Sequence, residues 1–313
     1  MPLAGRVAVR GETLGRRRLP AASSLVDRHI RWLLVTPAVL LILFLTIYPL
    51  GYSMWVNFVN YDVEIPGHAF VGLDNFTNVW NDPIARHALW VTLGLSAASV
   101  AVELVLGFLL ALAMLRAFIG RRILMVVFVV PLFVSPVIVG TFFSLILTRP
   151  FGPTNYLLQH LLGHTVNIDF TNDKPWYFIS IVLADAWQWT PFMFIILLAG
   201  LASISDQLYE AADIDGATPR QSFFFVTLPL LAPIVILAVT FRLVDSLKLF
   251  DVIYVLTRGG PGNATYTLSY YLYQEGFQLF HLGQGTAGSW MFMALITVIA
   301  AWLVRRLLKP VEA

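Results

Sequence analysis

Long apolar stretches alternate with shorter polar ones along the whole chain. Six apolar segments lie near residues 32–58, 88–115, 123–148, 177–202, 227–248 and 286–304. Each is long enough to cross a hydrocarbon core of roughly 30 Å as a helix, which needs about 18 residues or more. The first segment also exceeds the roughly 7–15 apolar residues of a cleaved signal peptide, so we interpret it as a retained helix. We therefore predict an all-α integral membrane protein with six transmembrane helices.

The composition supports a membrane protein. The chain is 58% hydrophobic and only 12% charged, whereas soluble domains carry about 25% charged residues. Its mean hydropathy is +0.77. This balance excludes a disordered chain and an ordinary soluble enzyme. The absence of cysteine excludes disulfides, thiolate metal sites and cysteine nucleophiles.

Basic residues predict which side of the membrane each loop faces. Arginine and lysine gather in the tail before the first segment, in the loop after the second, in the loop after the fourth and at the C-terminus. Since cytoplasmic loops are the positively charged ones, both termini are predicted to be cytoplasmic, with residues 1–31 as a basic tail and 32–308 as the six-span domain. The basic residues on this side are Arg6, Arg10, Arg16, Arg17, Arg18, Arg28, Arg31, Arg116, Arg121, Arg122, Arg220, Arg305, Arg306 and Lys309; the opposite loops hold only Arg86, Arg149, Lys174 and Arg258.

Catalytic motifs are missing from the sequence. None of the three lysines lies in a Gly-Lys-Ser/Thr phosphate loop, and no Gly-x-Ser-x-Gly motif occurs. We expect no catalytic residue, no cofactor and no metal in this chain. The small net charge of +2 gives no reason to expect nucleic acid.

The cytoplasmic loop at 203–226 carries the most specific pattern. Ser205 is suited to cap a first short helix, and Gly216 to end it. Thr218 and Pro219 are suited to start a second short helix before the fifth span. Small residues flanked by acids on the first helix favour docking into a groove on a partner protein, although a hairpin lying on the membrane is the alternative.

This loop resembles the EAA motif of ATP-binding-cassette importer permeases. The matching positions are Glu210-Ala211-Ala212, then Gly216, then Leu228-Pro229. Gly72-Leu73-Asp74-Asn75-Phe76, Trp187-x-x-x-Pro191-Phe192 and the stretch from Phe250 to Pro261 resemble the carbohydrate-importing branch, the maltose and glycerol-phosphate permease type. The resemblance implies that residues 203–226 couple the permease to an ATPase. The expected coupling residues are Glu210, Ala211, Ala212, Asp213, Asp215, Gly216 and Ala217.

The resemblance also implies a fold and a set of partners. The fold is the type I ABC-importer permease bundle, with a coupling-helix loop in the cytoplasm. The partners are a second, similar permease, two ATP-binding subunits that bind ATP and Mg²⁺, and an extracytoplasmic solute-binding protein. The expected location is the bacterial inner membrane, and the expected cargo is a sugar or sugar-like solute imported into the cytoplasm.

Two polar stripes inside the membrane are candidates for the solute pathway. Residues spaced i, i+3, i+4 and i+7 share one helix face in the fourth span and another in the fifth. Each stripe combines hydrogen-bonding groups with aromatic or aliphatic surface, which suits a sugar. With Ser135 of the third span, the candidates are Asp185, Gln188, Trp189, Phe192, Arg242, Asp245, Ser246 and Leu249.

Three points stay open at this stage. In the maltose-type permease, the positions of the fifth-span stripe are mostly amides and hydroxyls, so Arg242 and Asp245 here depart from the pattern. They either bind the solute, with an anionic group on it, or form an internal ion network with Lys248. We expect Glu103 to be an interhelical partner. Pro131 and Pro136 are expected to bend the third span and to free backbone carbonyls, either for a cavity or as a plain packing kink.

Two further interpretations concern the outer loops and the function. The outer aromatics, including Trp80, Trp176, Tyr270, Tyr271 and Tyr273, favour an interfacial belt. The alternative function is an ion-coupled secondary transporter that works alone, with Asp185, Arg242 and Asp245 as coupling groups. Such transporters often contain inverted repeats, and none is visible in this sequence.

Overall fold

The computed structural model describes residues 22–62, 67–115, 118–149 and 152–307. Residues 1–21 of the predicted tail, Arg116 and Lys309 lie outside the described residues. The chain divides into two units, residues 1–53 and 54–313, which are treated separately below.

The first unit contains most of helix α1 (Ala22–Val56), which begins earlier than the predicted start near residue 32. Every side chain from residue 34 to residue 52 is exposed. The mean hydropathy of 34–56 is 2.1. An apolar helix with no buried face in its own unit is suited to lipid or to another protein surface.

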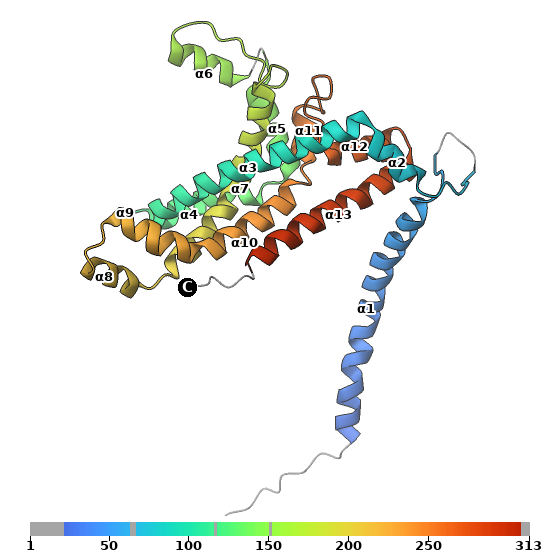
Figure 1. Ribbon diagram of the computed structural model, residues 1–313, viewed down its shortest axis with the longest axis horizontal. Coiled ribbons are helices and arrows are strands. Elements are labelled where there is room, and N and C mark those ends of the chain that lie inside the picture. Colours follow the sequence, from blue (N-terminus) through green and yellow to red (C-terminus); the bar gives the residue numbers. More distant parts are fainter. Residues whose placement is uncertain (1–21, 63–66, 116–117, 150–151, 308–313) are drawn as a thin grey trace, which may run out of the picture. The chain divides into compact units, whose positions relative to one another are not determined.

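The core of the second unit is a group of long helices that run side by side (Figure 1): α3 (Pro83–Leu115), α7 (Trp176–Ala202), α10 (Leu228–Ser246) and α13 (Leu282–Leu307). The sequence allows α3 and α7 to approach closely because Gly107 has no side chain. A Cβ placed there would lie 2.6 Å from the Cβ of Met193. The hydrophobic effect does not drive helix association in lipid, so helices associate there through close packing at small residues.

The third predicted span is sharply bent. It consists of α4 (Arg121–Val129), the 3₁₀ helix η1 (Val130–Phe133) and α5 (Pro136–Leu147), and its two halves are bent by 99°. Pro131 and Pro136 lie at the break, as expected for residues that lack the N–H of a continuous helix. The described residues contain five helices long and apolar enough to span a membrane, and up to six if this bent pair is one span.

Short helices occupy the predicted outer loops: α2 (Asp74–Asn81), α6 (Pro153–Leu162), α11 (Asp251–Leu256), α12 (Leu268–Tyr273) and the π-helical segment η3 (Gln274–Gln278). Two of the aromatics assigned to an interfacial belt are instead buried. Tyr270 and Tyr271 are 5% and 2% exposed, and the Tyr271 hydroxyl donates to Asp82 Oδ2 at 2.7 Å. The belt prediction is therefore wrong for both tyrosines, because the segment folds back into the protein as a helix.

The capping signals of the loop at 203–226 are confirmed. Helix α8 (Asp206–Ile214) starts at the Ser205 cap, whose side chain accepts from the Gln207 N–H. Helix α9 (Pro219–Ser222) starts at Thr218, which forms a capping box with Gln221. Between them, Gly216 adopts a φ of 75°. The Ala217 N–H bonds to the Ala212 carbonyl and the Gly216 N–H to the Asp213 carbonyl, which is the hydrogen-bond pattern of a Schellman motif.

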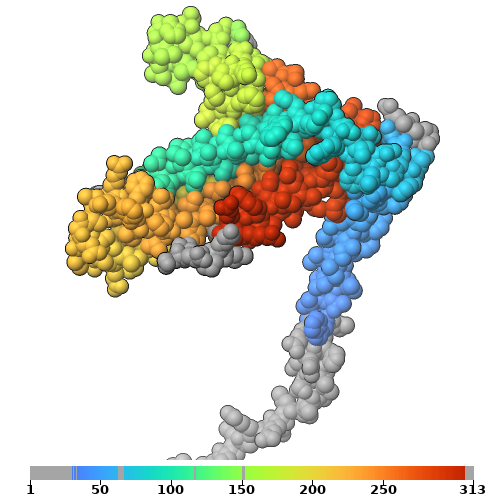
Figure 2. Space-filling view, in the orientation of Figure 1, coloured from blue at the N-terminus to red at the C-terminus, as the bar shows by residue number. Residues whose placement is uncertain are grey.

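The prediction of a separate second short helix is wrong. Helix α9 continues through the π-helical segment η2 (Phe223–Thr227) into α10, so that residues 219–246 form one span. The Leu228 N–H bonds to the Phe223 carbonyl, five residues earlier. This wider turn precedes Pro229 and keeps the helix continuous. Helices α8 and α9 lie at the end of the bundle opposite α2 and α12 (Figures 1 and 2).

Candidate functional site

A polar cavity of about 130 Å³ lies where α7, the end of α10 and the start of α11 meet α5. The two predicted stripes face each other across it, since it is lined by Asp185, Gln188 and Trp189 from α7 and by Arg242, Asp245 and Ser246 from α10. Leu249 follows α10 and also lines it. The facing of the two stripes was therefore predicted correctly for these residues and Leu249, though not for Phe192.

Arg242 is the centre of a buried ion cluster next to the cavity. Its side chain is 1% exposed. Its Nε lies 2.7 Å from Glu103 Oε2, and one terminal nitrogen lies 2.9 Å from Glu103 Oε1 and 2.6 Å from Asp185 Oδ2. The other terminal nitrogen lies 3.3 Å from Asp245 Oδ2. The cluster joins α3, α7 and α10.

This cluster answers two of the open points. Glu103 is the interhelical partner that the sequence suggested. The internal network of the fifth span also exists, because Arg242 contacts Asp245 and Lys248 Nζ lies 3.4 Å from Asp245 Oδ1. The network is larger than predicted, since it reaches carboxylates on two other helices. Buried charges in a membrane need such partners.

Arg242 Nε contacts Glu103 Oε2 as an ion pair at 2.7 Å but without hydrogen-bond geometry. Apart from it, two polar atoms of the cavity lining have no hydrogen-bond partner in the described structure: Gln188 Oε1 and Ser246 Oγ. Their residues are 2% and 1% exposed. Gln188 Nε2 is engaged, because it donates to the Val134 carbonyl at 2.7 Å. That carbonyl lies in the break of the third span, so the bend frees a backbone acceptor that a side chain of α7 uses. Buried polar atoms without partners are uncommon and call for a ligand or water.

Aromatic rings surround the cluster. The ring of Trp189 lies over the Arg242 guanidinium, 4.8 Å from centroid to Cζ, and contacts Phe192 edge-on at 6.3 Å. Phe250 lines the cavity and belongs to an aromatic group with Tyr254 and Tyr273 at centroid distances of 5.5 and 5.1 Å. Flat apolar surfaces and hydrogen-bonding groups therefore occur together around one small cavity.

The cavity does not include every predicted residue. Phe192 and Ser135 do not line it. Ser135 is exposed and occupies the N-cap position of α5, without a side-chain cap hydrogen bond, next to Pro136, which does line the cavity. Sequence reasoning did not assign Pro136, Lys248, Phe250, Asp251 and Val252 to the pathway, yet they line it. Most of these follow the fifth-span stripe directly. The end of α10 at Ser246 could have identified them, because the residues that follow this helix end line the same cavity.

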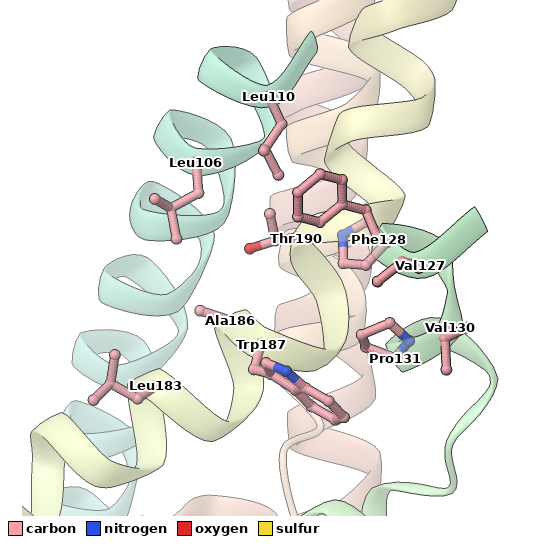
Figure 3. A pocket seen from close by; sticks show the side chains of 11 residues that line it. Leu106, Leu110, Val127, Phe128, Val130, Pro131, Leu183, Ala186, Trp187 and Thr190 are labelled. Carbon is pink, nitrogen blue, oxygen red and sulfur yellow. The ribbon is translucent and has the colours of Figure 1, made fainter. Parts of the chain in front are cut away.

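A second, larger pocket of about 630 Å³ is apolar (Figure 3). It lies between α3, the bent third span and α7. Leu106, Phe128, Pro131, Trp187 and Thr190 are among the side chains that point into it. Thr190 Oγ1 has no hydrogen-bond partner in the described structure. With little else polar in its lining, this pocket matches lipid-facing surface better than a sugar site.

The predicted coupling residues form a surface at the other end of α10. Helix α8 has no buried residue. Ile214 is 86% exposed and Leu208 44% exposed, next to the exposed acids Glu210 and Asp213. The Tyr209 hydroxyl lies 2.9 Å from Thr227 Oγ1 and connects α8 to η2. An apolar and acidic helix face held out in this way is suited to a partner protein.

These features define a class: a helical membrane protein with a polar cavity among its spans and an exposed short helix outside them. Residues 103–310 match the family described as binding-protein-dependent transport system inner membrane component. The chain belongs to this family and is therefore an inner-membrane permease component of such a transport system.

Individual relatives agree. The chain is 36% identical over 97% of its length to a probable ABC transporter permease protein of Sinorhizobium fredii, of which 95% is covered. It is 34% identical over 89% of its length to the trehalose/maltose transport system permease protein MalF of Thermococcus litoralis, of which 92% is covered. A bacterial ABC transporter involved in the import of the acidic polysaccharide alginate has the same fold, with a TM-score of 0.78 and 23% identity over 94% of this chain and 100% of that one.

Proposed function

We propose that this permease forms half of the translocation pathway of an ATP-binding-cassette importer, and that it moves a sugar or sugar-like solute into the cytoplasm. The single observation that carries the proposal is the cavity in which the α7 and α10 stripes face each other. The sugar is suggested by the trehalose/maltose relative and by the combination of aromatic rings with hydroxyl and amide groups in the cavity lining.

Within the cavity, Trp189 and Phe250 offer ring surfaces for stacking, and Ser246 and Gln188 offer groups for sugar hydroxyls. The volume of about 130 Å³ is that of roughly one sugar ring, so a longer solute would extend beyond it. Phe192 supports this stacking surface through its edge contact with Trp189.

Coupling to ATP hydrolysis takes place through α8. The exposed helix, with Glu210, Ala211, Ala212 and Asp213, docks in a groove of an ATP-binding subunit, and the turn at Asp215, Gly216 and Ala217 closes it. ATP and Mg²⁺ are bound by that subunit, since this chain has no phosphate loop. Hydrolysis is therefore a partner's activity, and this chain is not an enzyme.

The remaining partners complete the importer. A second permease supplies the other half of the pathway, two ATP-binding subunits dock on the cytoplasmic side, and a solute-binding protein docks outside. The arginine asymmetry supports cytoplasmic termini, with residues 1–31 as a tail on that side.

The test is uptake of labelled sugars into proteoliposomes that contain the assembled importer, its binding protein and enclosed ATP. We expect ATP-dependent and binding-protein-dependent uptake, lost in Trp189→Ala. The control is Trp80→Ala, because Trp80 is 67% exposed on α2 and lies outside the cavity. Uptake that needs an ion gradient but no ATP would contradict the proposal, as would normal uptake by Trp189→Ala.

A further inference from the structure

Every nitrogen of the Arg242 guanidinium lies within 3.3 Å of a carboxylate oxygen, with Nε held by an ion pair that lacks hydrogen-bond geometry. Nε and one terminal nitrogen bind Glu103, the same terminal nitrogen binds Asp185, and the other contacts Asp245. The ring of Trp189 covers one face of the group. An anionic solute therefore finds no free edge of Arg242 to bind, because each edge that could form a forked contact is already used.

The charges around the cavity have no positive excess. Its cations are Arg242 and Lys248, and its lining acids are Asp185, Asp245 and Asp251, with Glu103 bound to Arg242 behind them. Even with one buried carboxylate protonated, the acids outnumber the cations. Lys248 is the more accessible cation, at 57% exposed, but it is paired with Asp245. Like charges placed together oppose binding, so this lining disfavours a phosphate or carboxylate.

Among the cavity-lining atoms without a hydrogen-bond partner, the two that no ion pair engages are neutral. Gln188 Oε1 is an acceptor, and Ser246 Oγ can both donate and accept. Both belong to residues that are nine-tenths or more buried and both line the cavity. A neighbouring pair of uncharged hydroxyl groups would satisfy both atoms. A charged oxygen would leave its own charge without a counter-ion.

We propose that the cavity selects an uncharged polyhydroxyl solute over an anionic one, with Gln188 and Ser246 as the hydroxyl-binding groups and Arg242 as an internal counter-ion that positions α3, α7 and α10. This inference rests on the proposed function and names its substrate class. It decides between the two roles that the sequence left open for Arg242, since the cation serves the protein's own carboxylates.

The first experiment compares matched solutes in the assembled importer: trehalose with trehalose 6-phosphate, and glucose with glucuronate. Uptake into proteoliposomes is measured with the binding protein present. Displacement of the best-transported sugar is then measured on the importer without the binding protein, so that selection by that protein does not contribute. We expect the anionic member of each pair to compete at least about tenfold more weakly.

An anionic solute that is taken up best, or that competes as well as its neutral partner, overturns the inference but leaves the sugar importer intact. Absence of any ATP-dependent uptake for every sugar tested overturns the proposed function and the inference with it. The two failures are thus distinguishable.

The second experiment uses a matched pair of serines. Ser246→Ala removes an unpartnered buried hydroxyl from the cavity lining, whereas Ser96→Ala removes an unpartnered buried hydroxyl from α3 outside it. Neither change breaks a described hydrogen bond, so both variants should fold with unchanged melting temperature. We expect Ser246→Ala to weaken binding of the neutral sugar by about tenfold and Ser96→Ala to leave it unchanged. Equal binding by both variants overturns the assignment of Ser246.

A third variant tests Arg242 without removing it. Glu103→Gln keeps the size of the side chain and releases part of the guanidinium from its negative partner. We expect this variant to gain competition by glucuronate relative to glucose, compared with the unmodified importer. If the relative competition does not change while Glu103→Gln assembles normally, Arg242 is not what controls charge selection.

Discussion

At the residue scale, Arg242 shows how a costly group is kept in a membrane protein. A charged side chain within a span costs roughly 2.5–3.5 kcal/mol on insertion scales unless it is paired or hydrated. Here the guanidinium is matched to carboxylates on α3, α7 and its own helix. The cluster connects three spans at one point, so removing one of its side chains leaves the remaining charges without a partner.

We expect Arg242→Met to destabilise the permease strongly, because Glu103 and Asp185 would stay buried without a counter-ion. Breaking a buried pair costs about 3–5 kcal/mol. Thermal unfolding of the purified permease pair measures the effect. Lys248→Met is the control, since Lys248 is 57% exposed and an exposed pair contributes about 0–1 kcal/mol. Similar melting temperatures for the two variants would show that the cluster is not stabilising.

At the scale of elements, two glycines of the same helix differ in what surrounds them. A Cβ at Gly107 would lie 2.6 Å from Met193 Cβ and 2.9 Å from the Phe194 backbone nitrogen, whereas a Cβ at Gly94 meets nothing within 4 Å. Both residues lie in α3. The difference isolates the close approach of α3 to α7 from the intrinsic effect of glycine in a helix.

Gly107→Ala should therefore push α3 away from α7 and destabilise the protein by about 1–3 kcal/mol, the usual cost of overpacking. Gly94→Ala should be neutral or slightly stabilising, because alanine favours helix. Melting temperatures of the two purified variants give the comparison. Equal melting temperatures would mean that α3 and α7 can move apart at this contact without loss of stability.

The end of α8 offers a second matched pair. Gly216 and Gly163 both end a helix with a left-handed φ, 75° and 71°, and neither would bring a Cβ within 4 Å of another atom. Valine at either position costs backbone strain of about 1–2 kcal/mol. Only Gly216 lies beside α8, the proposed coupling helix, so only Gly216→Val should disturb the ATP-binding subunit.

We expect Gly216→Val to lower stimulated ATP hydrolysis by about tenfold, which corresponds to about 1.4 kcal/mol at the contact. Co-purification of the ATP-binding subunit should also weaken, while the two permeases stay paired. Gly163→Val should keep this co-purification. Normal hydrolysis and uptake by Gly216→Val would mean that the loop is only a surface hairpin.

Local signals of the elements were predictable from the sequence. The caps at Ser205 and Thr218 and the turn at Gly216 depend on residues within a few positions, and all three are confirmed. The continuation of α9 into α10 was not predictable, because Pro229 resembles a helix boundary. The π turn before Pro229 keeps the helix continuous through hydrogen bonds between residues five apart, and no residue type in the sequence indicates such a turn.

At the scale of the whole molecule, the sequence could not predict which residues far apart along the chain lie close together in space. Periodicity placed Asp185 and Arg242 on polar faces of their helices, but Glu103, which completes the cluster, lies 139 residues before Arg242 in the chain. Which faces meet depends on the packing of α3, α7 and α10. The bend at Pro131 and Pro136 was predicted, whereas its angle of 99° depends on what α5 packs against.

The topology of the membrane domain can be tested by labelling. The chain contains no cysteine, so single cysteines report without background. Cysteines at the exposed positions Asn78 and Thr165 should react with an impermeant thiol reagent added to intact cells, and one at the exposed Gln221 should react only after the membrane is opened. Labelling of Gln221 from outside would reverse the predicted orientation and place α8 on the wrong side for the proposed contact with an ATPase.

The continuous helix from Pro219 to Ser246 has a mechanical consequence. Its 28 residues make a rod about 42 Å long at about 1.5 Å per residue. One end adjoins α8, and the other holds Arg242 and Ser246. If this rod pivots as one piece near one end, a tilt of about 5° displaces its other end by about 4 Å, because the rod is about 42 Å long. Under that condition, a small displacement at the α8 end changes the width of the cavity by more than the length of a hydrogen bond.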